Sequence, residues 1–223
     1  MKRWLMWMTA LALAGVLTAC AGTAGQADTE HSQPVQGESQ SERESPTPAP
    51  TVSEFPHEDG EGGVLVAYFS ATSNTRGVAQ TLQGVLDAYL YEITAAEPYT
   101  QDDLNYSNDG CRANQEQNDP DARPAMAGTL ENPEDYDVVF LGYPIWWGQA
   151  PKIVYTFLER CDFGDADIIP FCTSGSSGIG GSLDDLQALA PQANWHAGQR
   201  FGAGASQDEI AQWVDGLELD LPQ

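Results

Sequence analysis

The sequence predicts an α/β fold built on a doubly wound parallel sheet of five strands. Three apolar runs, 64–69, 138–141 and 168–171, are each followed by a loop of polar, aromatic or glycine residues and then by a helical pattern. Alternation of strand, loop and helix is typical of parallel sheets with helices on both faces. Further strands are expected at 90–93 and 195–201, which gives the predicted sheet order 2-1-3-4-5.

Helical periodicity follows the first strand and returns toward the C-terminus. The apolar positions of the first helix share one face: Val78, Leu82, Val85, Leu86 and Tyr89. Pro151 suits the first turn of a helix after the strand at 138–141. Two later helices have capping signals, each a serine followed three positions later by an acidic residue. They are Ser182 with Asp185, and Ser206 with Glu209.

The loop after the first strand reads SATSNTR, from Ser70 to Arg76. A buried strand that leads through hydroxyl residues into a helix can bind phosphate with backbone N–H groups and the helix N-terminus. Serine and threonine before a helix also serve simply as caps, so this loop alone leaves both interpretations open.

The loop after the strand at 138–141 reads GYPIWWGQAP, from Gly142 to Pro151. Its proline and glycine favour a rigid turn that presents aromatic side chains where a strand ends. Trp146 and Trp147 could both fill the core, but adjacent side chains point in different directions, so at least one is expected to leave it. An exposed indole at this place would suit a flat ring.

The loop after the strand at 168–171 reads CTSGSSGIGGS, from Cys172 to Ser182. Its glycines allow the backbone to approach a ligand closely, although a flexible surface loop would have the same composition. In an open parallel sheet all three loops lie at the carboxyl ends of strands, where this architecture binds ligands. Together they predict one ligand site at that edge.

Three segments give the region from about Val64 to Gln223 a resemblance to a known family. They are YFSATSNT (68–75), YDVVFLGYPIWWGQAP (136–151) and PFCTSGSSGIGGS (170–182). In these segments the chain resembles the flavodoxins, specifically the flavodoxin-like proteins with a YPIWWG loop. The resemblance implies a flavodoxin-like fold with FMN as the cofactor, its phosphate in the first loop and its isoalloxazine ring between the second and third.

The resemblance also assigns cofactor-binding residues by position. They are Ser70, Thr72, Ser73, Asn74, Thr75, Arg76, Pro144, Ile145, Trp146, Trp147, Gly148, Thr173, Ser174, Gly175, Ser176 and Gly178. Ser73 stands where the family usually has the glycine of T-G-N-T, so a positive φ there would strain Ser73 and reduce FMN affinity. Arg76 would help backbone donors to offset the charge of the phosphate. No residue is predicted to be catalytic, because the flavin itself stores the electrons.

The N-terminus carries a predicted export signal. Two basic residues precede an apolar stretch at 4–17, which is shorter than the about 20 residues of a membrane-spanning helix. The sequence LTAC at 17–20 resembles the lipobox of bacterial lipoproteins. Residues 1–19 are therefore predicted to be a lipoprotein signal peptide and Cys20 the lipidation site, with an uncleaved membrane anchor as the alternative. Either would place the protein at the cell envelope, outside the cytoplasm.

Residues 20–61 are predicted to be the lipidated cysteine and a disordered acidic tether. Beyond the cysteine this stretch has no leucine or isoleucine and is rich in Ser, Pro, Gln and Glu, so it has little to bury. Residues 62–223 are long enough for one flavodoxin-like domain with a substantial core.

The chain is strongly acidic, with 9 basic and 33 acidic residues and a formal net charge of −24. No basic stripe is present to neutralise phosphates, which excludes nucleic-acid binding and leaves the lipid anchor as the predicted membrane contact. A basic redox partner would be attracted, although the same acidity is typical of solubility or of adaptation to salt.

Cysteine and histidine are sparse in the predicted domain. Cys111, Cys161 and Cys172 allow at most one internal disulfide, with three possible pairings. Cys172 ends a buried strand and is expected to be inert, whereas Cys111 lies in a polar loop and is expected to be reactive. His196 is the one histidine after residue 61, and no CxxC spacing occurs, so no metal site is predicted.

Residues 94–136 form a long polar stretch with little periodicity. A connection of this length inside a domain is usually either functional or disordered. The resemblance implies that it lies near the edge of the flavin, where it could carry residues that select the partner.

The leading functional prediction is an FMN-binding electron-transfer flavoprotein, tethered to the cell envelope, that serves a redox partner protein or a small quinone-like acceptor. The first alternative is an NAD(P)H-dependent quinone reductase on the same fold, although no GxGxxG signature indicates a dedicated nicotinamide site. The second alternative is a flavodoxin-shaped binding or scaffold module without flavin. Fold alone does not decide between them.

Overall fold

The computed structural model describes residues 63–217 and residue 219. The predicted signal peptide (1–19), the lipidation site Cys20 and the predicted tether (20–61) lie outside the described residues and stay predictions. Within the described part of the chain, no helix combines the length and the apolar character needed to cross a bilayer.

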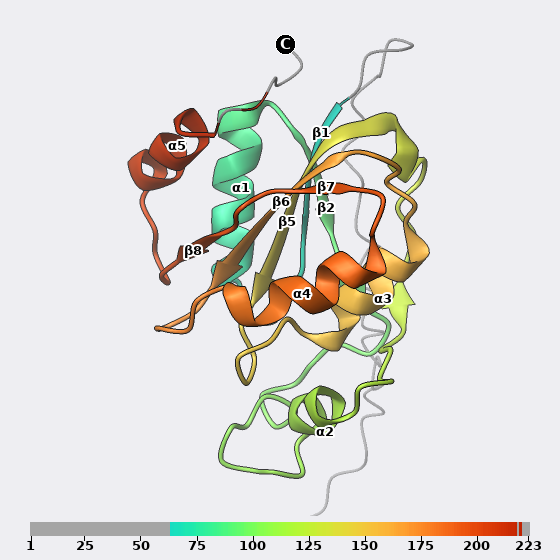
Figure 1. Cartoon of the computed structure of the whole chain (residues 1–223). Coiled ribbons are helices and arrows are strands. Elements are labelled where there is room, and N and C mark those ends of the chain that lie inside the picture. Colours follow the sequence, from blue (N-terminus) through green and yellow to red (C-terminus); the bar gives the residue numbers. More distant parts are fainter. Residues whose placement is uncertain (1–62, 218, 220–223) are drawn as a thin grey trace, which may run out of the picture. The chain divides into compact units, whose positions relative to one another are not determined.

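The expected parallel sheet is present (Figure 1). Its strands are β1 (Gly63–Tyr68), β2 (Tyr89–Glu92), β5 (Tyr136–Pro144), β6 (Asp167–Thr173), β7 (Asn194–Trp195) and β8 (Gln199–Phe201). They follow the order β2-β1-β5-β6-β7, with β8 also paired to β6, and every pair is parallel. When β7 and β8 are taken as one broken fifth strand, the order is 2-1-3-4-5. The predicted fold class is therefore confirmed.

The fifth strand is interrupted, whereas the sequence predicts one strand over 195–201. The carbonyl of Ile168 in β6 points toward the fifth strand, because it accepts the N–H of His196, directly after β7, at 3.0 Å. Pro170, two residues further along β6, faces the same side and has no N–H to donate, so the ladder stops there. Gly198 lies against this proline, where a Cβ would be 2.8 Å from the Pro170 carbonyl oxygen.

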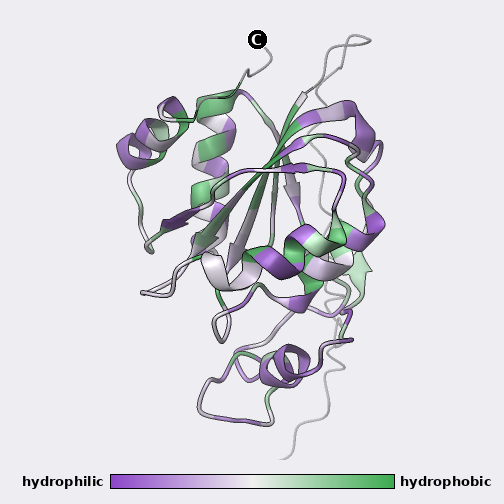
Figure 2. Cartoon of the chain, in the orientation of Figure 1, coloured by the Kyte–Doolittle hydropathy of each residue, from purple (hydrophilic) through white to green (hydrophobic). Residues whose placement is uncertain are grey.

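Helices cover both faces of the sheet (Figure 1). They are α1 (Asn74–Leu86) and α5 (Gln207–Asp215) on one face, and α3 (Lys152–Arg160) and α4 (Gly180–Leu189) on the other. Figure 2 shows hydrophobic residues concentrated in the strands and on the helix sides that face them. The hydrophobic effect thus holds each helix layer against the central strands.

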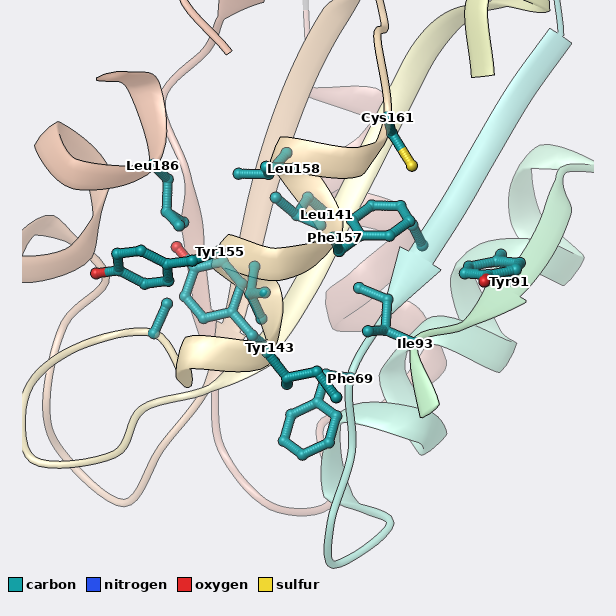
Figure 3. Close-up of a cluster of buried hydrophobic side chains, with 14 of the residues drawn as sticks. Phe69, Tyr91, Ile93, Leu141, Tyr143, Tyr155, Phe157, Leu158, Cys161 and Leu186 are labelled. Atoms are coloured by element: carbon teal, nitrogen blue, oxygen red, sulfur yellow. The ribbon is translucent and has the colours of Figure 1, made fainter. Parts of the chain in front are cut away.

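The apolar cluster on the α3 and α4 side fixes the carboxyl end of β5. Figure 3 shows Leu141 of β5 beside Phe157 of α3, and Tyr143 of β5 beside Tyr155 of the same helix. All four side chains are buried. Because β5 continues directly into the loop with the two tryptophans, this packing gives that loop a rigid base.

The first helix is shorter than its apolar pattern predicts, because Tyr89 begins β2 instead of extending α1. Asp87 takes a left-handed backbone conformation with φ 51°, and the N–H of Ala88 donates to the carbonyl of Gln83. This ending satisfies a terminal carbonyl of the helix and turns the chain into β2.

One predicted helix cap is wrong and one is confirmed. Helix α4 begins at Gly180, so Ser182 lies inside it, fully buried, and its hydroxyl donates to the Ile179 carbonyl at 2.8 Å. Ser206 caps α5 as predicted, because its Oγ accepts the N–H of Glu209 at 3.1 Å.

The segment 94–136 is folded. It contains the antiparallel pair β3 (Thr94–Ala95) and β4 (Met126–Ala127), the helix α2 (Arg112–Asn118) and the 3-10 turn η1 (Pro133–Asp135). Arg112 links two parts of this segment. Its guanidinium forms a 2.7 Å ion pair with Glu116 and lies 4.1 Å from the centre of the Tyr99 ring. Helix α2 lies beyond the carboxyl ends of the strands (Figure 1).

Replacing Gly142 by alanine is expected to lower the free energy of unfolding by about 1–3 kcal/mol, because the core there has no room. A Cβ at this position would lie 2.2 Å from the ring of Phe171, which is fully buried. Gly84 in α1 is the matched control, since its Cβ would meet open space. Gly84→Ala should raise the free energy of unfolding by about 0.5–1 kcal/mol. Equal urea midpoints for the two variants would contradict this account of the core.

Candidate functional site

Three loops meet at the carboxyl edge of the sheet, as the sequence predicts. They are the first loop (70–73), the second loop (145–151) and the third loop (174–179), which follow β1, β5 and β6. The N–H of Phe69 donates to the Gly142 carbonyl at 2.9 Å, and the N–H of Ile145 donates to the Thr173 carbonyl at 3.0 Å. The residues that the resemblance assigns to the cofactor all lie in these loops or at the adjoining ends of β5, β6 and α1.

The first loop presents backbone donors at the start of α1. Ser73 is the residue before the helix and has φ 65°, so the positive φ considered from the sequence is present. No side chain caps the helix, and the first N–H groups of any helix have no intrahelical partner. The Oγ of Ser70 is also buried without a hydrogen-bond partner. A row of free N–H groups beside a hydroxyl without a partner is suited to an anion.

Thr75 ties the first loop to β6. Its side chain is buried, and its Oγ1 lies 2.8 Å from Oγ1 of Thr173. Thr72 and Asn74 are exposed, and the Asn74 amide donates to the Thr72 hydroxyl at 3.4 Å. The two exposed polar groups therefore remain accessible to a ligand, while Thr75 fixes the spacing between two loops.

Arg76 is already paired at the edge of the first loop. Its guanidinium lies 2.5 Å from a carboxylate oxygen of Glu92, whose other oxygen accepts the Tyr68 hydroxyl at 3.2 Å. The hydrogen bond with Glu92 raises the pKa of Arg76, and burial raises the pKa of Tyr68. Because Glu92 balances its charge, Arg76 brings little net positive charge to the loop.

A small cavity adjoins this ion pair. It has a volume of about 190 Å³ and lies between the first loop and the end of β2. Ser70, Ala71, Arg76 and Glu92 form part of its wall, and Tyr99 from the long segment closes another side. The edge of the sheet is therefore hollowed beside the uncapped helix start.

The two tryptophans of the second loop separate, as expected for adjacent side chains. Trp146 is buried and contacts Phe69 and Tyr99 edge-on, with ring centroids 5.5 and 5.2 Å apart. Trp147 is 37% exposed. At least one indole thus leaves the core, and it is the second.

Trp147 occupies a position where the backbone favours glycine or asparagine. Trp147 and Gly148 have φ values of 47° and 83°, and Trp146 and Gln149 exchange two backbone hydrogen bonds of 2.9 Å around them. This is the geometry of a two-residue hairpin turn of type I′. A bulky residue with positive φ is strained by about 1–3 kcal/mol, so the indole is held here against a backbone cost.

The third loop is held by its neighbours and exposes its glycines. The Arg200 guanidinium donates to the Ser174 carbonyl at 2.8 Å, and the Ser174 hydroxyl donates to the Ser177 carbonyl. Gly175, Ser176 and Gly178 are exposed.

The second and third loops are in close contact through the start of α4. A Cβ on Gly181 would lie 2.6 Å from the Gly148 carbonyl oxygen, so α4 approaches the turn as closely as only glycine permits. Beneath them Tyr143 lies 3.0 Å from the Ser182 hydroxyl, and burial raises the pKa of Tyr143. Tyr143 therefore stays protonated and anchors α4 from below.

Two residues of the long segment reach the second loop and were not assigned from the sequence. The side-chain amide of Gln117 in α2 donates to the carbonyls of Trp146 (3.0 Å) and Ala150 (3.3 Å). Tyr106 stacks on Trp147. An aromatic residue in an otherwise polar run was the available signal for Tyr106, whereas nothing in the sequence marks Gln117.

The three cysteines contribute no accessible thiol to the site. In the described part of the chain Cys111, Cys161 and Cys172 are all free and buried, so the expectation of an accessible, reactive Cys111 is wrong. Cys111 directly precedes α2, and its side chain is buried in the apolar cluster on the α3 and α4 side of the sheet. Burial raises the pKa of Cys161 and of Cys172 to about 12, which keeps both thiols protonated and inert.

Among the residues described, no group of three or more His, Cys, Asp or Glu side chains could hold a metal ion.

Comparison with known proteins points to one family. A family model described as flavodoxin matches residues 63–217. The structure resembles a protein from Bacteroides uniformis described as a flavoprotein, with 40% identity and a TM-score of 0.67, over 70% of this chain and 99% of that one. A protein from Bacteroides eggerthii with the same description gives 41% identity and a TM-score of 0.67, over 72% and 100% of the two chains.

A more distant structure contains a flavin. A flavoprotein from Lactobacillus acidophilus, crystallised in complex with FMN, has 20% identity and a TM-score of 0.55, over 69% of this chain and 99% of that one. At this identity the likeness shows the fold alone. A search of the curated proteins found no match.

Replacing Ser73 by glycine is expected to raise the free energy of unfolding by about 0.5–1 kcal/mol. Glycine removes the Cβ that is strained at φ 65°, and this gain exceeds the added freedom of the unfolded chain. Ser73→Ala keeps the Cβ and should give no gain, which makes it the control. Urea unfolding of the three proteins measures the effect. A glycine variant no more stable than the alanine variant would show that Ser73 is not strained.

Proposed function

The chain belongs to the flavodoxin family, and we propose that it binds FMN at the three loops and works as an electron-transfer flavoprotein. The observation that carries this proposal is the uncapped start of α1 beside the buried, unpartnered hydroxyl of Ser70. When bound, FMN supplies chemistry in steps of one or two electrons, and the protein supplies binding, orientation and electrostatics.

The first loop fits the phosphate of FMN. The backbone N–H groups at the start of α1 would donate to its oxygens, and the helix dipole favours negative charge there. The hydroxyls of Ser70 and Thr72 and the amide of Asn74 would add side-chain donors. Because Glu92 neutralises Arg76, the phosphate would be held mainly by dipoles.

The second and third loops fit the ring. Residues 144–148 would border one side with Trp147 as the exposed flat surface, and residues 173–178 would close over the other side with little side-chain bulk. The buried Thr75–Thr173 contact would keep the phosphate end and the ring end at a fixed separation. The spacing between the first and third loops is therefore set before any ligand binds.

An electron carrier is favoured over a dedicated enzyme by the residues around the loops. The ionisable side chains nearest the first loop, Arg76 and Glu92, are paired with each other, so neither is available as a general acid or base. The net charge of −24 would attract a basic redox partner. A quinone-like acceptor and an NAD(P)H-dependent quinone reductase are the competing proposals, and steady-state oxidation of NAD(P)H with a quinone would favour the reductase.

The strain at Ser73 is the observation that favours a module without flavin. Ser73 stands in the left-handed region where the family usually has glycine, and this would reduce FMN affinity. The free donors of the first loop argue in the opposite direction, because a loop that no longer bound phosphate would gain from capping them.

FMN is expected to bind more tightly than riboflavin, which has the same ring and no phosphate. Glu92→Gln releases Arg76 toward the phosphate and should strengthen FMN binding roughly threefold, the scale of a surface charge interaction of ~0.6 kcal/mol. Riboflavin binding should not change. Titrations followed by flavin fluorescence measure both dissociation constants.

The same titrations also provide the contrary outcomes. Equal affinities for FMN and riboflavin would show that the first loop is not a phosphate site. No binding of either flavin would favour the module without flavin.

We also propose that Cys20 carries a lipid that tethers the domain to the cell envelope. The basis is the LTAC sequence at 17–20 and the acidic tether that follows it. In a bacterial host the full chain should incorporate labelled palmitate and fractionate with membranes, and Cys20→Ser should abolish the labelling. Equal labelling of the two chains would contradict the assignment.

A further inference from the structure

The geometry points to Tyr106 as a positioning residue of the flavin site, which stacks on one face of Trp147 and holds the other face ready for the ring. The inference rests on the proposed binding of FMN. It assigns a role to a residue in the long segment between β3 and α2.

The side chain of Trp147 serves neither its turn nor the core. A type I′ turn favours asparagine or glycine at this position, and the backbone of Trp147 has φ 47°. Core packing at the second loop is done by Trp146, which is buried, while Trp147 remains 37% exposed. A strained, exposed indole at the proposed ring site is therefore best explained by contact with a ligand.

Tyr106 and Trp147 are the two exposed large hydrophobic side chains of the described domain, and they stack on each other. Their ring centroids are 4.1 Å apart and the rings are nearly parallel, at 15°. Partial burial raises the pKa of Tyr106, and a hydrogen bond with the backbone of Trp147 opposes the rise. Contact of both ring and hydroxyl restricts the rotation that a free surface indole would have.

The loop that carries Tyr106 is itself rigid. The N–H of Ser107 donates to the side-chain oxygen of Asn105 at 3.0 Å, and the N–H of Asn108 donates to the backbone carbonyl of Asn105 at 2.9 Å. The Asn108 side chain in turn accepts the N–H of Gly110 at 3.0 Å. The two bonds to asparagine side chains form Asx turns and the bond to the Asn105 carbonyl closes a β-turn, so the backbone is held on both sides of Tyr106.

The same segment also holds the turn beneath Trp147. Gln117 donates to the carbonyls of Trp146 and Ala150, which lie on either side of the strained pair Trp147-Gly148. One folded unit thus fixes both the backbone of the turn and one face of its indole. The third loop offers no aromatic residue between Thr173 and Gly178, so Trp147 is the flat surface available to the ring.

The test compares Tyr106→Ala with Tyr106→Phe, which keeps the stacked ring. Loss of the stack should weaken binding of FMN and of riboflavin equally, by about 3- to 10-fold, because the ring contact is shared and the phosphate contact is not. It should also change the visible circular dichroism of the bound flavin, which reports the orientation of its aromatic neighbours. Tyr106→Phe should restore both readouts.

The outcomes separate this inference from the proposed function. A wild-type protein that binds no flavin overturns both. A wild-type protein that binds FMN, together with a Tyr106→Ala variant of unchanged affinity and dichroism, overturns the role of Tyr106 alone, even if its thermal midpoint falls. Tighter binding by Tyr106→Ala also overturns it, since Tyr106 would then compete with the ring.

Discussion

Parallel pairing of β1 with β5, and of β5 with β6, places the carboxyl ends of these three strands side by side, each hydrogen-bonded to its neighbour. Phe69 donates to the carbonyl of Gly142, and Ile145 donates to the carbonyl of Thr173. The loops that follow cannot separate unless the sheet itself opens. The proposed site is therefore as rigid as the buried strands below it, and the ligand does not have to bring the loops together.

Backbone strain distinguishes the site from the rest of the domain. Among the described residues, four that are not glycine have positive φ: Ser73, Asp87, Asn132 and Trp147. Asp87 and Asn132 flank helix ends, and aspartate and asparagine tolerate this conformation. Serine and tryptophan do not share that tolerance. Ser73 lies in the first loop and Trp147 lies in the second. At Trp147 the strain comes with an exposed indole at the proposed ring site, whereas at Ser73 it would reduce FMN affinity.

The sequence predicts the sheet and the three loops because each is a contiguous run, an apolar strand followed by residues of distinctive type. It does not predict features that depend on a partner elsewhere in the chain. The break between β7 and β8 comes from Pro170 on the neighbouring strand, and Ser182 matches a capping pattern but is taken by Tyr143 and Ile179. Tyr106 and Gln117 contact the second loop from about 30 to 40 residues away, with no periodicity to reveal them.

A crystal structure of the protein with FMN would show which groups hold the phosphate and which face the ring. We expect the phosphate within hydrogen-bonding distance of the backbone N–H groups at the start of α1 and of the Ser70 hydroxyl, and the ring against Trp147. A flavin bound elsewhere, or a phosphate held by Arg76 with its pair to Glu92 broken and the helix start left free, would contradict this expectation.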